Sequence, residues 1–287
     1  MTLERIAIMT DTNSGMTPEE ARQAGVALLA MPFTVDDRPC LEHLDLSQEE
    51  FYRLQTQGAS ISSSQPAPAD LLVMWDTLLE TNDYVIYIPM TSGLSGSCAT
   101  ATALAQDYDG KVLVVDNCRI SVPLKQAVLE AIHLRGTGKT AREIVDRLTE
   151  KALESRIYIT VEDLSFLKKT GRITPAVAAV GTVLNIKPVM KILDGKLDMH
   201  RKVRGMKQAR QTMLEAIHAD LAGDFAGKKV IIAAAYSGDR AEGETWAETV
   251  RQEFSAYPFM SDPLPLSIGC HVGPGALGAA IFTDIDE

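Results

Sequence analysis

The stretch that most constrains the fold is 84–116, where an apolar segment, a polar loop, a helix and a second apolar segment follow one another. Residues 84–89 are almost wholly apolar and predict a short buried strand. Residues 91–97 form a polar loop that leads into an alanine-rich helix over 98–106, and 111–116 predict the next strand. Strands that alternate with helices in this way indicate an α/β fold with a mostly parallel sheet.

A further strand predicted over 5–11 extends this pattern towards the N-terminus and ends at Asp11, as the strand over 111–116 ends at Asp116. The loops that leave the carboxyl ends of parallel strands form the usual ligand crevice of such sheets. We therefore expect the loops that begin at Asp11, Thr91 and Asp116 to lie on that side. Both carboxylates are interpreted as loop organisers, with a general acid or base role as the alternative.

The second half of the chain has a different pattern. Residues 156–161 predict a new strand, and Asp194-Gly195 between two extended segments is a strong two-residue hairpin signal. We expect two domains, a parallel α/β domain over 1–155 and an α+β domain with an antiparallel hairpin over 156–287. The last segment is expected to be a pair of strands split by a turn that carries His271, and it is able to pack back at the domain interface.

Composition restricts the classes of partner. The chain has 287 residues and a net charge of −10, which argues against nucleic acid or an anionic membrane as the main partner and leaves at most transient membrane contact. It begins without the apolar core of a signal peptide, so the cytoplasm is the default location. The four cysteines and five histidines are dispersed without the spacing of a zinc site or a disulfide framework, and we expect no metal or cofactor.

The polar loop over 91–97 is the best local candidate for an anion site. It lies between a strand and a helix, where free backbone N–H groups and the hydroxyls of Ser92 and Ser95 could face a ligand oxygen. The lysine of a P-loop is absent, so nucleotide binding has little support. The alternative is that these serines only cap the helix.

His271 lies in a glycine- and proline-rich stretch, 268–278, where a histidine could hydrogen-bond an anion. Ser92 or Ser95 could pair with it as the nucleophile of a serine hydrolase. That alternative lacks a GxSxG elbow and an acid marked to orient the histidine.

Two basic clusters lie in the second half, at 168–172 and at 201–210. In an acidic protein such local positive charge could meet a phosphate or an acidic partner, which leaves a phosphate- or nucleotide-binding regulator as another alternative. A solvated surface beside the hairpin is the simpler interpretation.

Taken in order, the motifs of the chain resemble those of the DegV family, which includes the fatty-acid-binding subunits of bacterial fatty acid kinase. The resemblance runs nearly from end to end. It is carried by Asp11 after the first strand, Ser63-Ser64-Gln65-Pro66, Thr91-Ser92-Gly93-Leu94-Ser95-Gly96-Ser97, residues 164–173, Leu184-Asn185-Ile186-Lys187-Pro188, Lys202-Val203-Arg204-Gly205 and His271-Val272-Gly273-Pro274-Gly275-Ala276.

The resemblance implies a two-domain protein that holds one long-chain fatty acid in a deep apolar tunnel between its domains. It implies that the carboxylate is hydrogen-bonded by Ser63, by the region of Ser92, Gly93 and Ser95, and by His271. Small and apolar residues at 176–181, with Val183, Leu184 and Ile186, could line the tunnel wall.

The resemblance also implies that the chain is a carrier and not an enzyme. A separate kinase subunit would phosphorylate the bound fatty acid to an acyl phosphate for phospholipid synthesis, and Arg172, Arg204 and Lys207 would face that partner or the phosphoryl group. The segment 117–123 departs from the family pattern, which bears on the shape of the cleft and on the acyl chain that fits.

Overall fold

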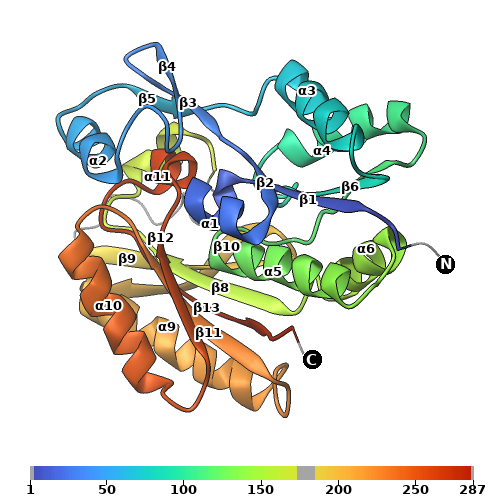
Figure 1. Cartoon of the computed structure of the whole chain (residues 1–287). Coiled ribbons are helices and arrows are strands. Elements are labelled where there is room, and N and C mark those ends of the chain that lie inside the picture. Colours follow the sequence, from blue (N-terminus) through green and yellow to red (C-terminus); the bar gives the residue numbers. More distant parts are fainter. Residues whose placement is uncertain (1–2, 173–184, 286–287) are drawn as a thin grey trace.

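A computed structural model gives the fold of residues 3–172 and 185–285 (Figure 1). As the alternation of strands and helices predicted, β1 (Ile6–Asp11), β2 (Val26–Leu29), β6 (Tyr84–Ile88) and β7 (Val112–Val114) form a parallel sheet in the order β2-β1-β6-β7. None of the helices in the described part of the chain is both long and apolar enough to cross a bilayer.

Helices cover both faces of this sheet because its strands are apolar on both sides. Ile8 and Ile86 face α1 (Pro18–Ala24), α5 (Val122–Gly136) and α6 (Ala141–Glu150), and Met9 and Tyr87 face α3 (Pro68–Leu79) and α4 (Ser97–Leu104). Two short 3₁₀ turns, η1 (Thr12–Ser14) and η2 (Ala105–Tyr108), follow β1 and α4.

Residues 26–35 form two strands that belong to two different sheets. After β2 the chain leaves the parallel sheet, and β3 (Pro32–Val35) pairs antiparallel with β4 (Arg38–Leu41) and β5 (Ile61–Ser63). The two strands are separated at Met31, whose backbone bonds to groups outside both sheets: its N–H donates to Thr12 Oγ1 and its carbonyl accepts from Glu42 N. The helix α2 (Gln48–Thr56) packs beside this small sheet.

The third sheet, formed by the second half of the chain, has six strands in the order β10-β9-β8-β13-β11-β12. The hairpin predicted at Asp194-Gly195 is confirmed: β9 (Ile186–Leu193) and β10 (Lys196–Arg204) pair antiparallel, and both turn residues have positive φ. The remaining strands are β8 (Ser155–Thr160), β11 (Val230–Tyr236), β12 (Phe259–Pro263) and β13 (Leu277–Thr283). A boundary between 155 and 156 stays a prediction.

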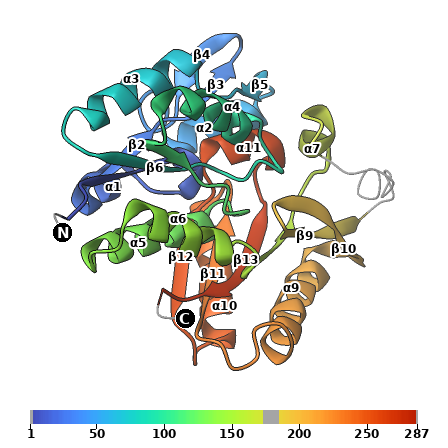
Figure 2. The same cartoon turned by 90° about the vertical axis from the view of Figure 1, so that its right-hand side faces the viewer.

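One face of the six-stranded sheet packs against α9 (Gly205–Ala222) and α10 (Arg240–Glu253), around the buried Trp246 and Met213. Its other face is turned towards the N-terminal half of the chain, as the two views at right angles show (Figures 1 and 2). The short helix α7 (Ser165–Lys169) follows β8.

The two strands expected on either side of His271 are present as β12 and β13, but the expectation that His271 lies in a turn between them is wrong. His271 belongs to a short helix, α11 (Leu266–Val272), and β12 and β13 both pair with β11. The helix ends where Gly273, at φ 68°, takes a conformation that suits glycine. Leu266 and Cys270 of α11 pack against Phe51 of α2 and Phe33 of β3, so this C-terminal helix joins the N-terminal half.

Candidate functional site

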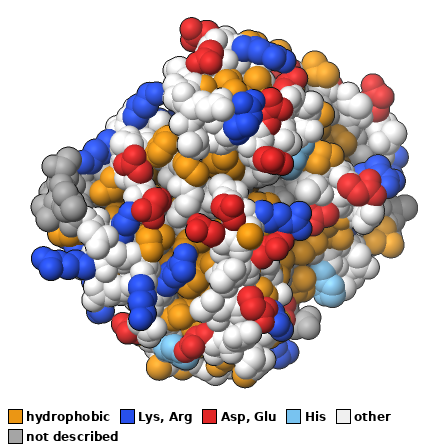
Figure 3. Space-filling view, turned by 90° about the vertical axis from the view of Figure 1, so that its left-hand side faces the viewer, with side chains coloured by type: hydrophobic (Ala, Val, Ile, Leu, Met, Phe, Trp, Pro, Cys, Tyr) orange, Lys and Arg blue, Asp and Glu red, His pale blue; other side chains and the backbone are white. Residues whose placement is uncertain are grey.

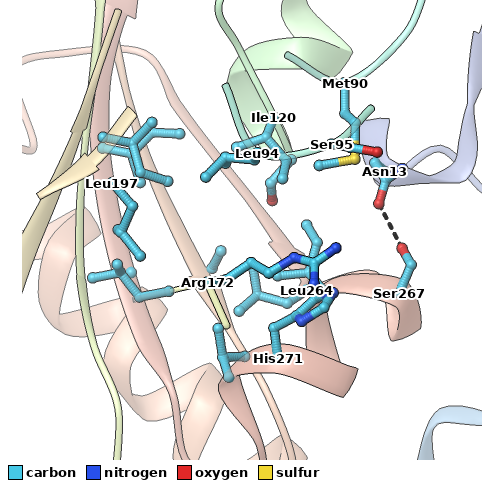
Figure 4. A pocket seen from close by; sticks show the side chains of 18 of the residues that line it. Asn13, Met90, Leu94, Ser95, Ile120, Arg172, Leu197, Leu264, Ser267 and His271 are labelled. Atoms are coloured by element: carbon cyan, nitrogen blue, oxygen red, sulfur yellow. Dashed lines mark hydrogen bonds between the residues drawn. The ribbon is translucent and has the colours of Figure 1, made fainter. Parts of the chain in front are cut away.

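A cavity of about 290 Å³ lies between the free face of the six-stranded sheet, α11 and the loops that follow the parallel strands. Its wall is mainly apolar, and its polar side chains gather near α11 (Figure 4). The apolar lining includes Met31, Met90, Leu94, Ile120, Val122, Ile157, Ile159, Met190, Ile192, Leu197, Leu264 and Ile268.

Two residues far apart in the sequence meet at the polar side of the cavity. Ser63, at the end of β5, places its Oγ 2.7 Å from Nε2 of His271, and either atom can be the donor. Burial lowers the pKa of His271 to about 4, with a further contribution from the charge of Arg172. The imidazole is therefore neutral near pH 7, and its buried Nδ1 has no hydrogen-bond partner among the described residues.

A buried polar network supports α11 beside this pair. Ser267 Oγ donates to Asn13 Oδ1 at 2.5 Å, and Glu42 accepts from Leu266 N and, at 2.8 Å, from Thr12 Oγ1. Burial raises the pKa of Glu42 to about 7. Because Glu42 contacts both the turn after β1 and the start of α11, it fixes the helix that carries His271.

Asp11 also stabilises the turn after β1. Its carboxylate accepts from Asn13 N at 2.9 Å and from Met90 N at 3.2 Å, which fits the sequence-based interpretation of Asp11 as a loop organiser. Burial raises its pKa to about 6.

Asn13, Ser121 and Ser267 line the cavity and were not selected from the sequence. Among the described residues, Asn13 Nδ2 and Ser121 Oγ are buried without a hydrogen-bond partner, and Ser121 takes a positive φ of 56° just before α5. One signal in the sequence could have found Asn13, which lies two residues after the first strand. Ser267 precedes His271 by four residues and so shares one side of α11 with it, but the sequence did not predict that helix.

Of the residues implied by family resemblance to contact the ligand, Ser63, Ser95 and His271 line the cavity. Ser95 Oγ donates to Ser97 Oγ at 3.0 Å and accepts from Ser97 N at the start of α4. Ser92 is exposed and lies outside the lining, and its N–H donates to Asp116 Oδ2.

Gly93 also lies outside the lining, and its role in the structure is close packing. A Cβ atom at position 93 would collide with the carbonyl oxygen of Gly195, and one at Gly195 would collide with Thr91 Oγ1. The polar loop and the tip of the β9–β10 hairpin are thus held against each other by two glycines.

Arg172 lines the cavity, and its side chain extends towards His271 (Figure 4). Arg204 and Lys207, at the junction of β10 and α9, are exposed and lie outside the lining. Figure 3 shows several Lys and Arg side chains along the left part of the face that it draws, with some acidic side chains among them. The proposed wall residues 176–181, Val183 and Leu184 lie outside the described residues, and Ile186 is not part of the lining.

Within 3–172 and 185–285 there is no group of three or more histidine, cysteine, aspartate or glutamate side chains arranged to hold a metal ion. All four cysteines are free thiols in the structure.

A family model whose description reads "Uncharacterised protein, DegV family" matches residues 5–284. The chain belongs to the DegV family. A DegV domain-containing protein of Clostridium acetobutylicum is 30% identical over 97% of this chain and 98% of its own length.

Solved DegV structures share the fold. A DegV family protein from Thermus thermophilus, described by its fatty acid binding, is 29% identical, with a TM-score of 0.87 over 97% of this chain and 99% of its own. DegV from Bacillus subtilis, described as a fatty acid binding protein, is 24% identical with a TM-score of 0.86, over 98% of this chain and 100% of its own, which is a likeness of fold.

Proposed function

We propose that this DegV protein binds one long-chain fatty acid in the cavity and presents its carboxylate to a separate kinase subunit. The observation that carries the proposal is a mainly apolar cavity with its hydroxyl and imidazole groups gathered near α11. The fatty acid binding described for the Thermus protein, whose fold this chain shares over nearly its full length, supports it.

The polar side of the cavity suits a carboxylate head group. Ser63 and the neutral His271 share one hydrogen bond, so the pair leaves one donor for a ligand, either the Ser63 O–H or the His271 Nδ1–H according to the tautomer. The Ser95 hydroxyl can serve a ligand if it turns away from Ser97. Hydrogen bonds to a charged acceptor are about twice as strong as those between neutral groups. Arg172 adds positive charge within the same lining. Asn13 Nδ2 and Ser121 Oγ, which are buried without a partner among the described residues, are further donors for a ligand oxygen.

The apolar part of the cavity suits an acyl chain. Each CH₂ group transferred from water to such a wall contributes roughly 0.8 kcal/mol, so affinity comes mainly from the chain and orientation from the head group.

The kinase step rests on the basic residues outside the cavity. Arg204 and Lys207 are exposed and could bind an acidic partner surface or the phosphoryl group, with Arg172 at the cavity itself. In this proposal the partner consumes ATP in the cytoplasm and forms the acyl phosphate for phospholipid synthesis, and the present chain is a carrier. Arg204→Ala and Lys207→Ala are expected to leave fatty acid affinity unchanged and to slow phosphorylation by the kinase.

The geometry gives less support to the two alternatives. The hydrolase alternative pairs His271 with Ser92 or Ser95, but Nε2 of His271 is hydrogen-bonded to Ser63 instead. None of the described carboxylates accepts a hydrogen bond from its Nδ1. For a nucleotide or phosphate regulator, several N–H groups of the 91–97 loop already have partners inside the protein, since Ser92 N donates to Asp116, Gly93 N to Thr91 Oγ1 and Ser97 N to Ser95 Oγ.

A displacement titration tests the proposal. Delipidated protein is loaded with a fluorescent fatty acid, and palmitate, a palmitoyl ester or ATP is added as competitor. We expect palmitate to displace the probe at one site, with no effect of ATP and no ester turnover. Ester hydrolysis that disappears in Ser95→Ala would favour the hydrolase, and a probe that never binds would refute the proposal.

A further inference from the structure

The floor of the cavity is the face of the six-stranded sheet that α9 and α10 leave free. The strand register places the residues of this face in rows that cross four strands. One row contains Ala235, Gly278, Ile159 and Met190, and the next contains Ala233, Ala280, Ile157 and Ile192. All eight residues line the cavity.

This floor has large side chains on two of its strands and small side chains on the other two. On β8 and β9 both rows carry large apolar side chains, whereas on β11 and β13 they carry only Ala233, Ala235, Gly278 and Ala280. These four residues, the small-residue bed, leave room above two neighbouring strands. A Cβ atom added at Gly278 would make only ordinary van der Waals contacts, so the bed also has free space above the glycine.

The bed is closed at one end. The next row on the same face contains Ile231 and Phe282, which are buried, lie outside the lining and pack with Val122 at the start of α5. At the other end the bed approaches α11, since Ala235 packs in one cluster with Leu264, Ile268 and Val272. The rows are two residues apart, or about 7 Å along a strand.

Polar groups lie at the end of the bed opposite to Ile231 and Phe282, where they can hold the head group of a ligand. His271 and Ser267 belong to α11. Asn13 and Ser121, both more than nine-tenths buried, line the same cavity with donors that have no partner within 3–172 and 185–285. An amphipathic ligand whose head is held near α11 can therefore extend its tail over the bed towards Phe282.

We propose that the small-residue bed receives the distal part of the acyl chain, and that the Ile231–Phe282 row sets the longest chain that fits. This inference rests on the proposed fatty acid binding. It states that the side chains of β11 and β13 determine which acyl chain length fits. The row of Ala235 and Gly278 lies under every acyl chain, and the row of Ala233 and Ala280 only under the longer ones.

The test compares affinities for laurate, myristate, palmitate, stearate and arachidate. Ala280→Leu fills the distal row and is expected to lower the affinity for stearate relative to laurate about tenfold, because about two CH₂ groups lose their buried position. Ala280→Val is the milder variant if the leucine prevents folding. Phe282→Leu removes part of the closing row and is expected to raise the affinity for arachidate relative to palmitate.

Ala216→Val is the matched control. It adds the same two methyl groups to a buried alanine of α9, which packs on the other side of the sheet and lies outside the lining. We expect this variant to leave the chain-length profile unchanged, even where it lowers stability as much as Ala280→Val does. Equal profiles for Ala280→Val and Ala216→Val, or an unchanged profile in Ala280→Leu, would overturn the assignment of the bed while fatty acid binding stood. A wild-type protein that binds none of the five acids would overturn the proposed function and this inference with it.

Discussion

Ser63 Oγ lies 2.7 Å from His271 Nε2, although 208 positions separate the two residues in the chain. β5 brings the serine to the cavity from the N-terminal half, and α11 brings the histidine from the C-terminal segment. The pair thus links two halves of the molecule at the polar side of the cavity.

His271→Ala and Ser63→Ala are each expected to weaken fatty acid binding about tenfold to 100-fold. The reason is the loss of a hydrogen bond to a charged head group, which is worth about 1.5–3 kcal/mol. Displacement titration of the folded variants measures the effect. Ser92→Ala is the control, because Ser92 lies outside the lining, and its affinity should stay within about twofold of wild type. Equal loss in all three variants would contradict the site.

Stability should depend on pH through Glu42. Its pKa in the folded protein is about 7, against an ordinary value of 4.5, so the folded state holds a proton that the unfolded chain releases. The corresponding stability is fully present below about pH 4.5 and is lost as pH rises through about 7, a change on the order of 3 kcal/mol. Asp11, raised to about 6, acts in the same direction, and His271, lowered to about 4, acts in the opposite one.

Because these three groups titrate over overlapping pH ranges, the quantity to measure is the difference in the free energy of unfolding between wild type and Glu42→Gln. Wild type is expected to lose stability relative to the variant between about pH 5 and about pH 8. A difference that stays constant with pH would mean that Glu42 does not titrate in this range.

Replacing Gly93 should disturb packing more than ligand contact. Gly93→Ala drives a Cβ atom into the carbonyl of Gly195 and should cost about 1–3 kcal/mol of stability, by separating the polar loop from the β9–β10 turn. Gly96→Ala is the matched control, since its added methyl would meet only the Gln65 side chain at 3.7 Å. Chemical denaturation measures both, and equal stabilities would show that the two loops separate freely.

Arg172 is expected to influence the ionisation of His271. Its positive charge is the second cause of the lowered pKa, after burial, so Arg172→Ala should raise the pKa of His271 while leaving it below the ordinary 6.5. NMR titration of the imidazole provides the value. An unchanged pKa would place the guanidinium away from the ring in solution.

The sequence predicted those parts of the fold that depend on local pattern. The parallel strands and the turn at Asp194-Gly195 follow from apolar runs and turn residues within a few positions. The position of α11 does not, because its glycine- and proline-containing sequence fits a turn, and the helix is held by tertiary contacts such as those of Leu266 with Glu42 and α2.

The candidate site was predictable to a similar degree. Ser63, Ser95 and His271 were reached through motif resemblance, and all three line the cavity. Ser92, three positions from Ser95, is exposed and lies outside the lining, and nearby residues of one loop cannot be distinguished by sequence pattern alone. Glu42 and Ser267 act through a network whose members are brought together only by folding.

Mass spectrometry of an organic extract of the purified, folded protein tests the central claim most directly. The account predicts about one long-chain fatty acid per wild-type chain, and a clearly lower amount from His271→Ala prepared in the same way. An extract of folded wild-type protein that contains no fatty acid, with no uptake when palmitate is supplied, would contradict the account.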